Sequence, residues 1–151
     1  MLTEPWEPDF ERARLIRFSD CDPAGIVFYP QYFVMFNALV EDWFTEGLGI
    51  PFEHLIATRR TGVPTAHLSV DFRAPSAFGD TVMLGLSVVR VGGKSIELKV
   101  RCTKLDGAAR ITMRQVLVTT SLATHQSIAI PDDIRLAIQA QARHLAPSAA
   151  D

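Results

Sequence analysis

One segment of the chain, residues 31–46, carries apolar side chains around most of a helical circumference. Pro30 suits the first turn of such a helix, because the N–H that proline lacks is not needed there. Gly47 and Gly49 follow as signals for the end of the helix. Its polar residues recur every four positions and form only a narrow stripe: Asn37, Glu41 and Thr45. A helix this apolar is typical of an enclosed position. A sheet should therefore curl around it, and a partner subunit should cover the apolar surface that one layer leaves open.

The rest of the chain has the patterns of β-strands. An imperfect alternation over residues 12–18 predicts one strand before the helix. Gly92 with Gly93, and Asp106 with Gly107, are hairpin signals that separate later strands. Those later strands are predicted at 65–72, 81–91, 94–104 and 109–122. Tight turns join strands in antiparallel order. We therefore predict an α+β fold, in which an antiparallel sheet of about five strands wraps around the one long helix.

The whole chain of 151 residues, 48% hydrophobic and 21% charged, has the composition of one globular domain over 1–151. Its core is predicted at about 10–142, with an N-terminal arm, a short helix that starts at Pro131 and a frayed C-terminus. The net charge of -2 argues against a nucleic-acid partner. Two cysteines provide no disulfide framework or metal signature. No secretory signal or membrane-length apolar run is present, which predicts a cytoplasmic protein without a membrane partner.

Residues 19–30 connect the first predicted strand to the long helix and read Ser-Asp-Cys-Asp-Pro-Ala-Gly-Ile-Val-Phe-Tyr-Pro. They place Asp20 and Asp22 beside the N-terminus of a helix, where unpaired N–H groups carry a partial positive charge. A carboxylate there can attack a carbonyl or accept a proton, and the N–H groups can hold an oxyanion. The loop therefore predicts an acyl-transfer site.

Each polar residue of this loop also has a structural interpretation. Asp22 precedes Pro23, and Asp-Pro often opens a turn. Asp20 ends a strand and can accept hydrogen bonds from local backbone N–H groups, which favours a structural role. Cys21 is a possible nucleophile, but two flanking carboxylates should raise the pKa of its thiol and weaken it.

Two sequence motifs resemble the 4-hydroxybenzoyl-CoA thioesterase family, which has the hotdog fold. The first is Asp-Cys-Asp-Pro-Ala-Gly-Ile-Val-Phe-Tyr-Pro-Gln-Tyr-Phe at 20–33, and the second is Val-Asp-Phe-Arg-Ala-Pro-Ser-Ala-Phe-Gly-Asp at 70–80. The order of elements also matches the family over about 10–142. The resemblance implies an acyl-CoA thioesterase that needs no metal or other cofactor. It also implies a homodimer or homotetramer with active sites between subunits.

The family pattern implies roles for particular residues. Asp22 would be the catalytic carboxylate, the backbone N–H of Tyr29 would hold the thioester oxygen, and Gly25 belongs to the same loop. Phe28 and Asn37 depart from the family pattern near the expected acyl group, so the acyl group itself is left open. Candidates for the nucleotide end of CoA are Lys94 and Ser95 at a hairpin exit, and the further cations Arg90, Arg59 and Arg60.

Three readings of the function remain after these observations. The leading one is hydrolysis of an acyl-CoA with an apolar or aromatic acyl group, with Asp22 as nucleophile or general base. A non-catalytic acyl-CoA-binding module would not need that carboxylate. A hotdog 3-hydroxyacyl-thioester dehydratase would need a positioned histidine, which the loop lacks. Glu41 on the helix stripe and His67 on a predicted strand are possible further site residues, but solvated or structural roles are preferred for both.

Overall fold

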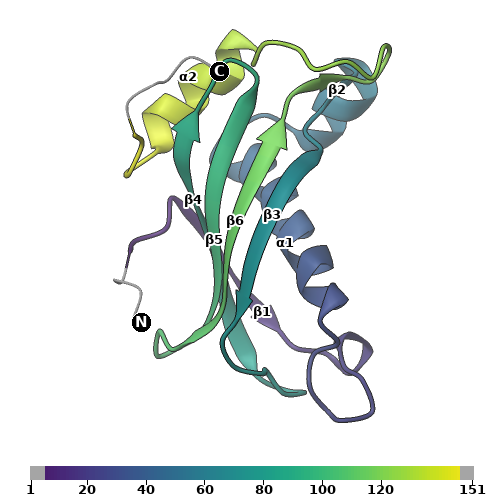
Figure 1. Ribbon diagram of the computed structural model, residues 1–151, viewed down its shortest axis with the longest axis vertical. Helices are drawn as coiled ribbons and strands as arrows, with labels where there is room; N and C mark the ends of the chain where they lie inside the picture. Colours follow the sequence, from purple (N-terminus) through teal and green to yellow (C-terminus); the bar gives the residue numbers. More distant parts are fainter. Residues whose placement is uncertain (1–5, 147–151) are drawn as a thin grey trace.

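The structure is a computed structural model that describes residues 6–146 of the chain (Figure 1). Its main sheet has five strands in the order β1-β4-β5-β6-β3, and all neighbours are antiparallel. The main elements are β1 (Phe10–Leu15), α1 (Pro30–Asp42), β3 (Thr65–Phe72), β4 (Thr81–Val91), β5 (Ser95–Lys104), β6 (Ala109–Val118) and α2 (Asp132–Gln141). The shorter ones are the 3₁₀ turn η1 (Phe18–Asp20), the π-turns η2 (Trp43–Gly47) and η3 (His54–Thr58), and the strands β2 (Thr61–Gly62) and β7 (Thr120–Ser121).

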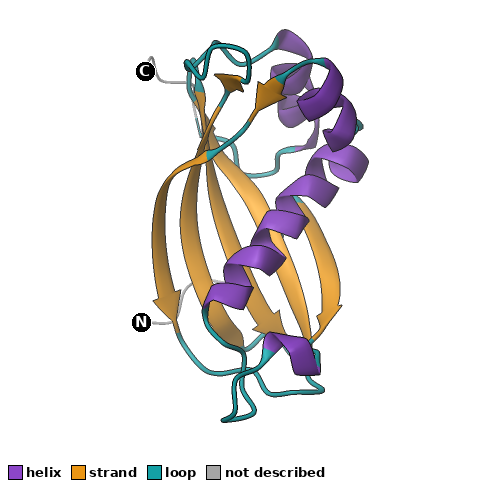
Figure 2. Ribbon diagram, turned by 90° about the vertical axis from the view of Figure 1, so that its right-hand side faces the viewer, coloured by secondary structure: helices purple, strands orange, loops and turns teal. Residues whose placement is uncertain are grey.

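The helix α1 crosses one face of the sheet (Figure 2). The sheet supplies alternate inward side chains from its central strands, among them Leu98 and Leu117, and these are buried. From α1 and η2, Phe36 and Trp43 pack against them and are 1% and 0% exposed. The α+β hotdog architecture predicted from the sequence is therefore confirmed, and Pro30 occupies the first turn of α1 as expected.

The single chain covers the long helix on one side only, and apolar surface is left open, as expected for a sheet of one layer. One stripe of α1 and η2 faces solvent, and it consists of Val34, Asn37, Ala38, Glu41 and Thr45. Val34 alone is 61% exposed. The helical hydrogen bonding also changes at Trp43, where the last turn widens into η2 before Gly49 adopts a positive φ of 72°. A one-layer sheet covers only one side of a helix, and for this reason the opposite stripe stays open.

Several boundaries differ from the sequence prediction. β1 begins at Phe10 and ends at Leu15, because the chain turns into η1 at Phe18 instead of continuing as a strand. The short strands β2 and β7 pair with each other, and neither was predicted. β4 and β5 are joined by residues 92–94, one residue more than predicted. The predicted N-terminal arm is docked over residues 6–9, where the Asp9 N–H donates to Ser87 Oγ at 2.9 Å.

The first and last five residues of the chain lie outside the described residues, and so does the predicted C-terminal fraying. No helix within residues 6–146 combines the length and apolar character needed to cross a membrane.

Candidate active site

The aspartate loop forms a small hairpin between η1 and α1. Cys21 pairs with Val27 as an antiparallel bridge, and the Asp22 N–H donates to the Ile26 carbonyl at 3.0 Å. Gly25 occupies the tip with a φ of 80°, a conformation that other residues rarely adopt. Its N–H donates to the Asp22 carbonyl at 2.9 Å. Gly25 therefore shapes the loop through its backbone.

Asp20 anchors this loop to the sheet. Its side chain is buried and accepts hydrogen bonds from Arg14 at 3.1 Å and from the Arg17 N–H at 2.8 Å. The carbonyl of Asp20 accepts the Phe28 N–H at 2.9 Å, and this bond joins the two ends of the loop. Because both its carboxylate and its carbonyl are used in this way, Asp20 has the structural role that the sequence favoured.

The Asp22 carboxylate is differently placed. It is partly exposed, and its Oδ1 accepts the Ala24 N–H at 2.9 Å, the only hydrogen bond that its carboxylate makes with residues 6–146. No ion pair with a lysine, arginine or histidine of residues 6–146 neutralises it. The other carboxylate oxygen is thus available to a proton or to a carbonyl carbon, as a nucleophile or a general base requires.

The backbone N–H of Tyr29 is the available donor at the start of α1. The Phe28 N–H is used by the Asp20 carbonyl, and the Gln31 and Tyr32 N–H groups bond to the carbonyls of Phe28 and Tyr29. No protein acceptor within the described part of the chain receives the Tyr29 N–H. The helix dipole adds a partial positive charge here. The same position can therefore hold a developing oxyanion.

An apolar hollow of about 290 Å³ lies next to Tyr29. The Phe72 ring lies 6.1 Å from the Tyr29 ring and 6.4 Å from the Tyr32 ring, so β3 and the start of α1 form adjoining walls. Ile111 of β6 and Pro75 also line it. Phe72 was not among the site residues predicted from the sequence, although it belongs to the second family motif and could have been included on that ground.

Other aromatic residues of the loop and helix divide between surface and core. Phe28 is 48% exposed, and its ring packs edge-to-face with that of Tyr29, with 5.8 Å between the ring centroids. Phe36 is a core residue, and Phe33 packs partly buried against the core. Of these three phenylalanines, only Phe28 extends from the loop toward solvent beside Tyr29.

Asn37 and Glu41 lie on the open stripe of α1, away from Tyr29. At 1.5 Å per residue they are about 12 Å and about 18 Å along the helix from it. Within one chain they therefore do not join the loop, and neither of them lines the hollow beside Tyr29. His67 is exposed on the edge strand β3.

The candidates for CoA binding lie at the opposite end of the sheet from Asp22. Lys94 and Ser95 are at the β4–β5 turn, while the loop adjoins the end of β4 near Thr81. The strand between these ends spans about 30 Å at 3.3 Å per residue. Arg90, near the same turn, forms an ion pair with Glu97 at 3.9 Å. Arg59 is bound to Asp133 at 2.6 Å, so it is already paired.

Cys21 has an environment that disfavours a thiolate. Burial raises the pKa of its thiol, and the charges of Asp20 and Asp22 raise it further. The direction agrees with the sequence prediction, although burial is the larger cause. At neutral pH the side chain therefore stays a thiol, which is a weak nucleophile.

We expect that Cys21→Ser will leave turnover within about twofold of the unchanged protein, because a neutral thiol contributes no nucleophile. The measurement is the rate of thioester hydrolysis at pH 7, with the melting temperature as a control for folding. A loss comparable to that of removing the Asp22 carboxylate would instead assign the chemistry to the sulfur.

Within residues 6–146, no group of three or more histidine, cysteine, aspartate or glutamate side chains converges in a way that could hold a metal ion. The candidate site combines one carboxylate, one backbone donor and a mainly apolar hollow that Arg73 also lines.

The sequence pattern of the thioesterase-like superfamily matches residues 16–138. A 1,4-dihydroxy-2-naphthoyl-CoA hydrolase from Nostoc punctiforme is 26% identical over 126 residues, covering 83% of each chain. A gentisyl-coenzyme A thioesterase structure superimposes with a TM-score of 0.78 at 29% identity, covering 85% of this chain and 99% of that one.

A thioesterase-superfamily structure from Jannaschia sp. CCS1 superimposes with a TM-score of 0.82 at 24% identity, covering 95% of this chain and 99% of its own. The superfamily match begins just after β1 and ends within α2, and so includes the loop, the helix and every strand of the sheet that follows them. The chain belongs to the thioesterase-like superfamily.

Proposed function

We propose that the protein is an acyl-CoA thioesterase in which Asp22 and the Tyr29 N–H act on the thioester carbonyl. The observation that carries the proposal is their arrangement: a carboxylate with one unengaged oxygen, and an unused N–H at the start of α1, in one loop. Its superfamily membership and its thioesterase relatives support the same activity.

The chemistry follows from these groups. In one route, Asp22 removes a proton from water, the water oxygen bonds to the carbonyl carbon, and the carbonyl oxygen becomes an oxyanion at the Tyr29 N–H. Collapse of that intermediate breaks the carbon–sulfur bond and releases CoA as a thiolate. In the other route, Asp22 bonds to the carbon itself, and water then cleaves the mixed anhydride. Both routes give the free acid and CoA.

The acyl group occupies the apolar hollow in this proposal. Phe72, Tyr32 and Ile111 provide apolar walls next to the Tyr29 N–H, which suits an aromatic or apolar acyl group. The relatives named for 1,4-dihydroxy-2-naphthoyl-CoA and gentisyl-CoA support an aromatic one. Phe28 and Asn37 lie at the rim and along the helix, where they would contact the distal part of that group.

A thiol-release assay over a panel of aliphatic and aromatic acyl-CoAs tests the proposal. We expect release from at least one aromatic member, with kcat in the ordinary range of about 1–10³ s⁻¹. Binding of acyl-CoA without release from any member would favour the non-catalytic binding module. Loss of water from a 3-hydroxyacyl-CoA, without release of thiol, would favour the dehydratase.

We also propose that two subunits pair along β3. This strand is at the edge of the sheet, so its outer N–H and C=O groups have no neighbour in the sheet. Leu68 is 40% and Phe72 is 52% exposed on it, and Val34 on the open stripe of α1 is 61% exposed. A two-fold partner would cover these apolar groups and close the open side of the hollow.

Light scattering at micromolar concentration should therefore give the mass of a dimer or tetramer. A charge on the pairing edge should oppose association, so Leu68→Lys is expected to weaken the dimer about tenfold or more. Leu136→Lys is the matched control, because Leu136 is an exposed leucine of α2, outside this surface. A stable monomer, or equal effects of the two substitutions, would contradict the pairing and the shared site.

A further part of the proposal concerns Lys94 and Ser95, which lie too far from Asp22 to serve the same chain's site. We propose that Lys94 of the partner subunit attracts the nucleotide phosphates of CoA. Such a contact acts on substrate and transition state alike, and so changes KM and not kcat. At about 1 kcal/mol for an exposed pair, Lys94→Ala should raise KM about fivefold at low salt, and less at high salt.

The matched control is Lys104→Ala, an exposed lysine at the other end of β5. An acyl-pantetheine, which lacks the nucleotide, should be hydrolysed equally by Lys94→Ala and the unchanged protein. Equal losses on both substrates would mean that Lys94 acts through the structure. No loss on acyl-CoA would mean that the phosphates bind elsewhere.

A further inference from the structure

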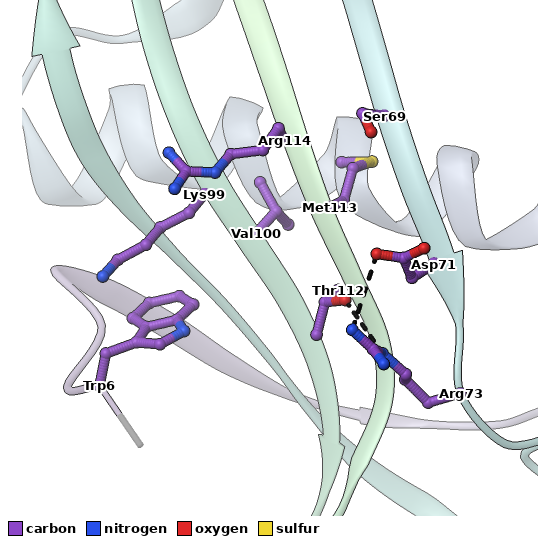
Figure 3. A pocket seen from close by; sticks show the side chains of 9 residues that line it. All are labelled: Trp6, Ser69, Asp71, Arg73, Lys99, Val100, Thr112, Met113 and Arg114. Atoms are coloured by element: carbon purple, nitrogen blue, oxygen red, sulfur yellow. Dashed lines mark hydrogen bonds and ion pairs between the residues drawn. The ribbon is translucent and has the colours of Figure 1, made fainter. Parts of the chain in front are cut away.

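The sheet face that points away from α1 has a hollow of about 310 Å³ (Figure 3). Its walls are Trp6 of the docked N-terminal segment and outward side chains of β3, β5 and β6. Figure 3 shows Lys99 and Arg114 on one side of it and Arg73 on the other. Arg73 also lines the hollow beside Tyr29, but none of the other residues that line this hollow does. The proposed thioesterase chemistry takes place on the other face of the sheet.

Two cations oppose each other directly across this face. Lys99 of β5 is in register with Arg114 of β6, and like charges directly opposite in a sheet are destabilising. Arg114 forms an ion pair with Glu97 at 3.4 Å, whereas Lys99 forms no ion pair with a carboxylate of residues 6–146. Burial lowers the pKa of Lys99, and the charge of Arg114 lowers it further. The charge of Asp9 acts in the opposite direction without forming an ion pair, so Lys99 is compensated only in part.

Trp6 holds this arrangement in place. Lys99 Nζ and the central carbon of the Arg101 guanidinium each lie 4.5 Å from the centroid of the Trp6 ring. The Trp6 carbonyl accepts a hydrogen bond from Arg101 at 2.8 Å. The segment is fixed further by Asp9, whose carboxylate accepts the Val88 N–H at 2.8 Å. The cations are therefore positioned around an aromatic wall and are not simply solvated along a strand.

The lining of the hollow is positive, although the whole chain has a net charge of -2. Arg73, Lys99 and Arg114 line it with a single carboxylate, Asp71, which Arg73 pairs with at 3.6 Å. The hydroxyl groups of Ser69 and Thr112 line the same space. A second copy of the chain, docked by the same face, would bring these cations against one another, so it does not match the charge.

We propose that this hollow binds a phosphate group of a small molecule, between Lys99 and Arg114. A phosphate dianion supplies the missing counter-charge and has several acceptor oxygens for an ammonium, a guanidinium and nearby hydroxyls. Inorganic phosphate and a nucleotide such as AMP share this chemistry. They differ in whether the rest of the ligand adds contacts, for example with Trp6.

The two tryptophans of the chain allow a direct test by NMR. Trp6 lines the hollow, whereas Trp43 is fully buried and its indole N–H donates to Gln141 Oε1 at 2.8 Å. In the ¹⁵N-labelled protein, we expect phosphate at constant ionic strength to shift the Trp6 indole resonance saturably, with a millimolar midpoint, and to leave that of Trp43 unchanged. The same titration with AMP distinguishes the two sources, and a lower midpoint for AMP assigns further contacts.

Lys99→Gln should raise the midpoint about tenfold or more, because one of two direct cations is lost. Lys104→Gln is the control, since Lys104 is on the same strand but pairs with Asp106 outside the hollow. The spectrum itself reports whether each variant is folded. Three results would overturn the proposal: no saturable shift of Trp6, an unchanged midpoint in Lys99→Gln, or a Trp6 shift that follows protein concentration instead of phosphate, which would make this face a subunit contact.

Discussion

Replacement of Asp22 by asparagine is expected to lower kcat by about 10² or more while the protein stays folded. Asparagine keeps the volume and can still accept the Ala24 N–H, so the turn should survive. It removes the negative charge, and with it the ability to take a proton or to bond to the carbonyl carbon. Asp20, and not Asp22, anchors the loop to Arg14 and Arg17.

Asp106→Asn is a matched control for this change. Asp106 lies in the exposed turn between β5 and β6, and its carboxylate accepts the Ala108 N–H at 2.9 Å, in the same local pattern as Asp22. It belongs neither to the aspartate loop nor to the lining of the apolar hollow, so its replacement should leave kcat unchanged. Near-normal turnover of Asp22→Asn with an unchanged melting temperature would refute the proposed role of the carboxylate.

A single turnover in ¹⁸O-labelled water distinguishes the two routes open to Asp22. If the carboxylate is the nucleophile, water cleaves a mixed anhydride and label enters the Asp22 side chain. If it is the general base, label is found only in the product acid. Mass spectrometry of the peptide that contains residues 20–33 reads out the difference.

The second large effect is expected from removal of the Tyr29 N–H. Tyr29→Pro deletes this donor, and the φ of −52° at this position is already within the range of proline. No backbone hydrogen bond is lost, because the Tyr29 N–H has no protein acceptor among the described residues. Loss of one oxyanion donor typically lowers kcat by about 10²–10³.

Tyr29→Ala separates the backbone from the side chain. It retains the N–H and removes the ring that contacts Phe28 and Phe72, so it should alter KM more than kcat. The informative quantity is the ratio of kcat between the alanine and proline variants, measured with both folded. A ratio near one would mean that the oxyanion is held by another donor.

Much of the candidate site could be predicted from the sequence. The aspartates, the start of the helix at Pro30 and the turn that Asp22 and Pro23 open depend on interactions within a few residues, and local chemistry determines these. The structural role of Asp20 followed from the same reasoning and is confirmed by its bond to the Arg17 N–H. The apolar surroundings of Tyr29 were not found, because Phe72 reaches it from a strand distant in sequence.

The positions of the predicted CoA-binding residues in the fold could not be predicted from local sequence either. Nothing local to Lys94 and Ser95 indicates that β4 and β5 carry them to the end of the sheet opposite Asp22. The same holds for Trp6, whose neighbours Lys99 and Arg101 are about ninety positions further along the chain. Side-chain type identified these residues as candidates, but only their placement decided which of them are neighbours.

By itself, the sequence determined the number and kind of the main elements, since helical and strand periodicities and turn residues act over short ranges. Only the tertiary structure decided the strand order, which leaves β3 as an exposed edge and the stripe of α1 uncovered. The reason is physical: strand pairing joins segments far apart in the chain, and the burial of all of them together selects one order. That order places the apolar hollow beside Tyr29 and the cationic hollow on the opposite face.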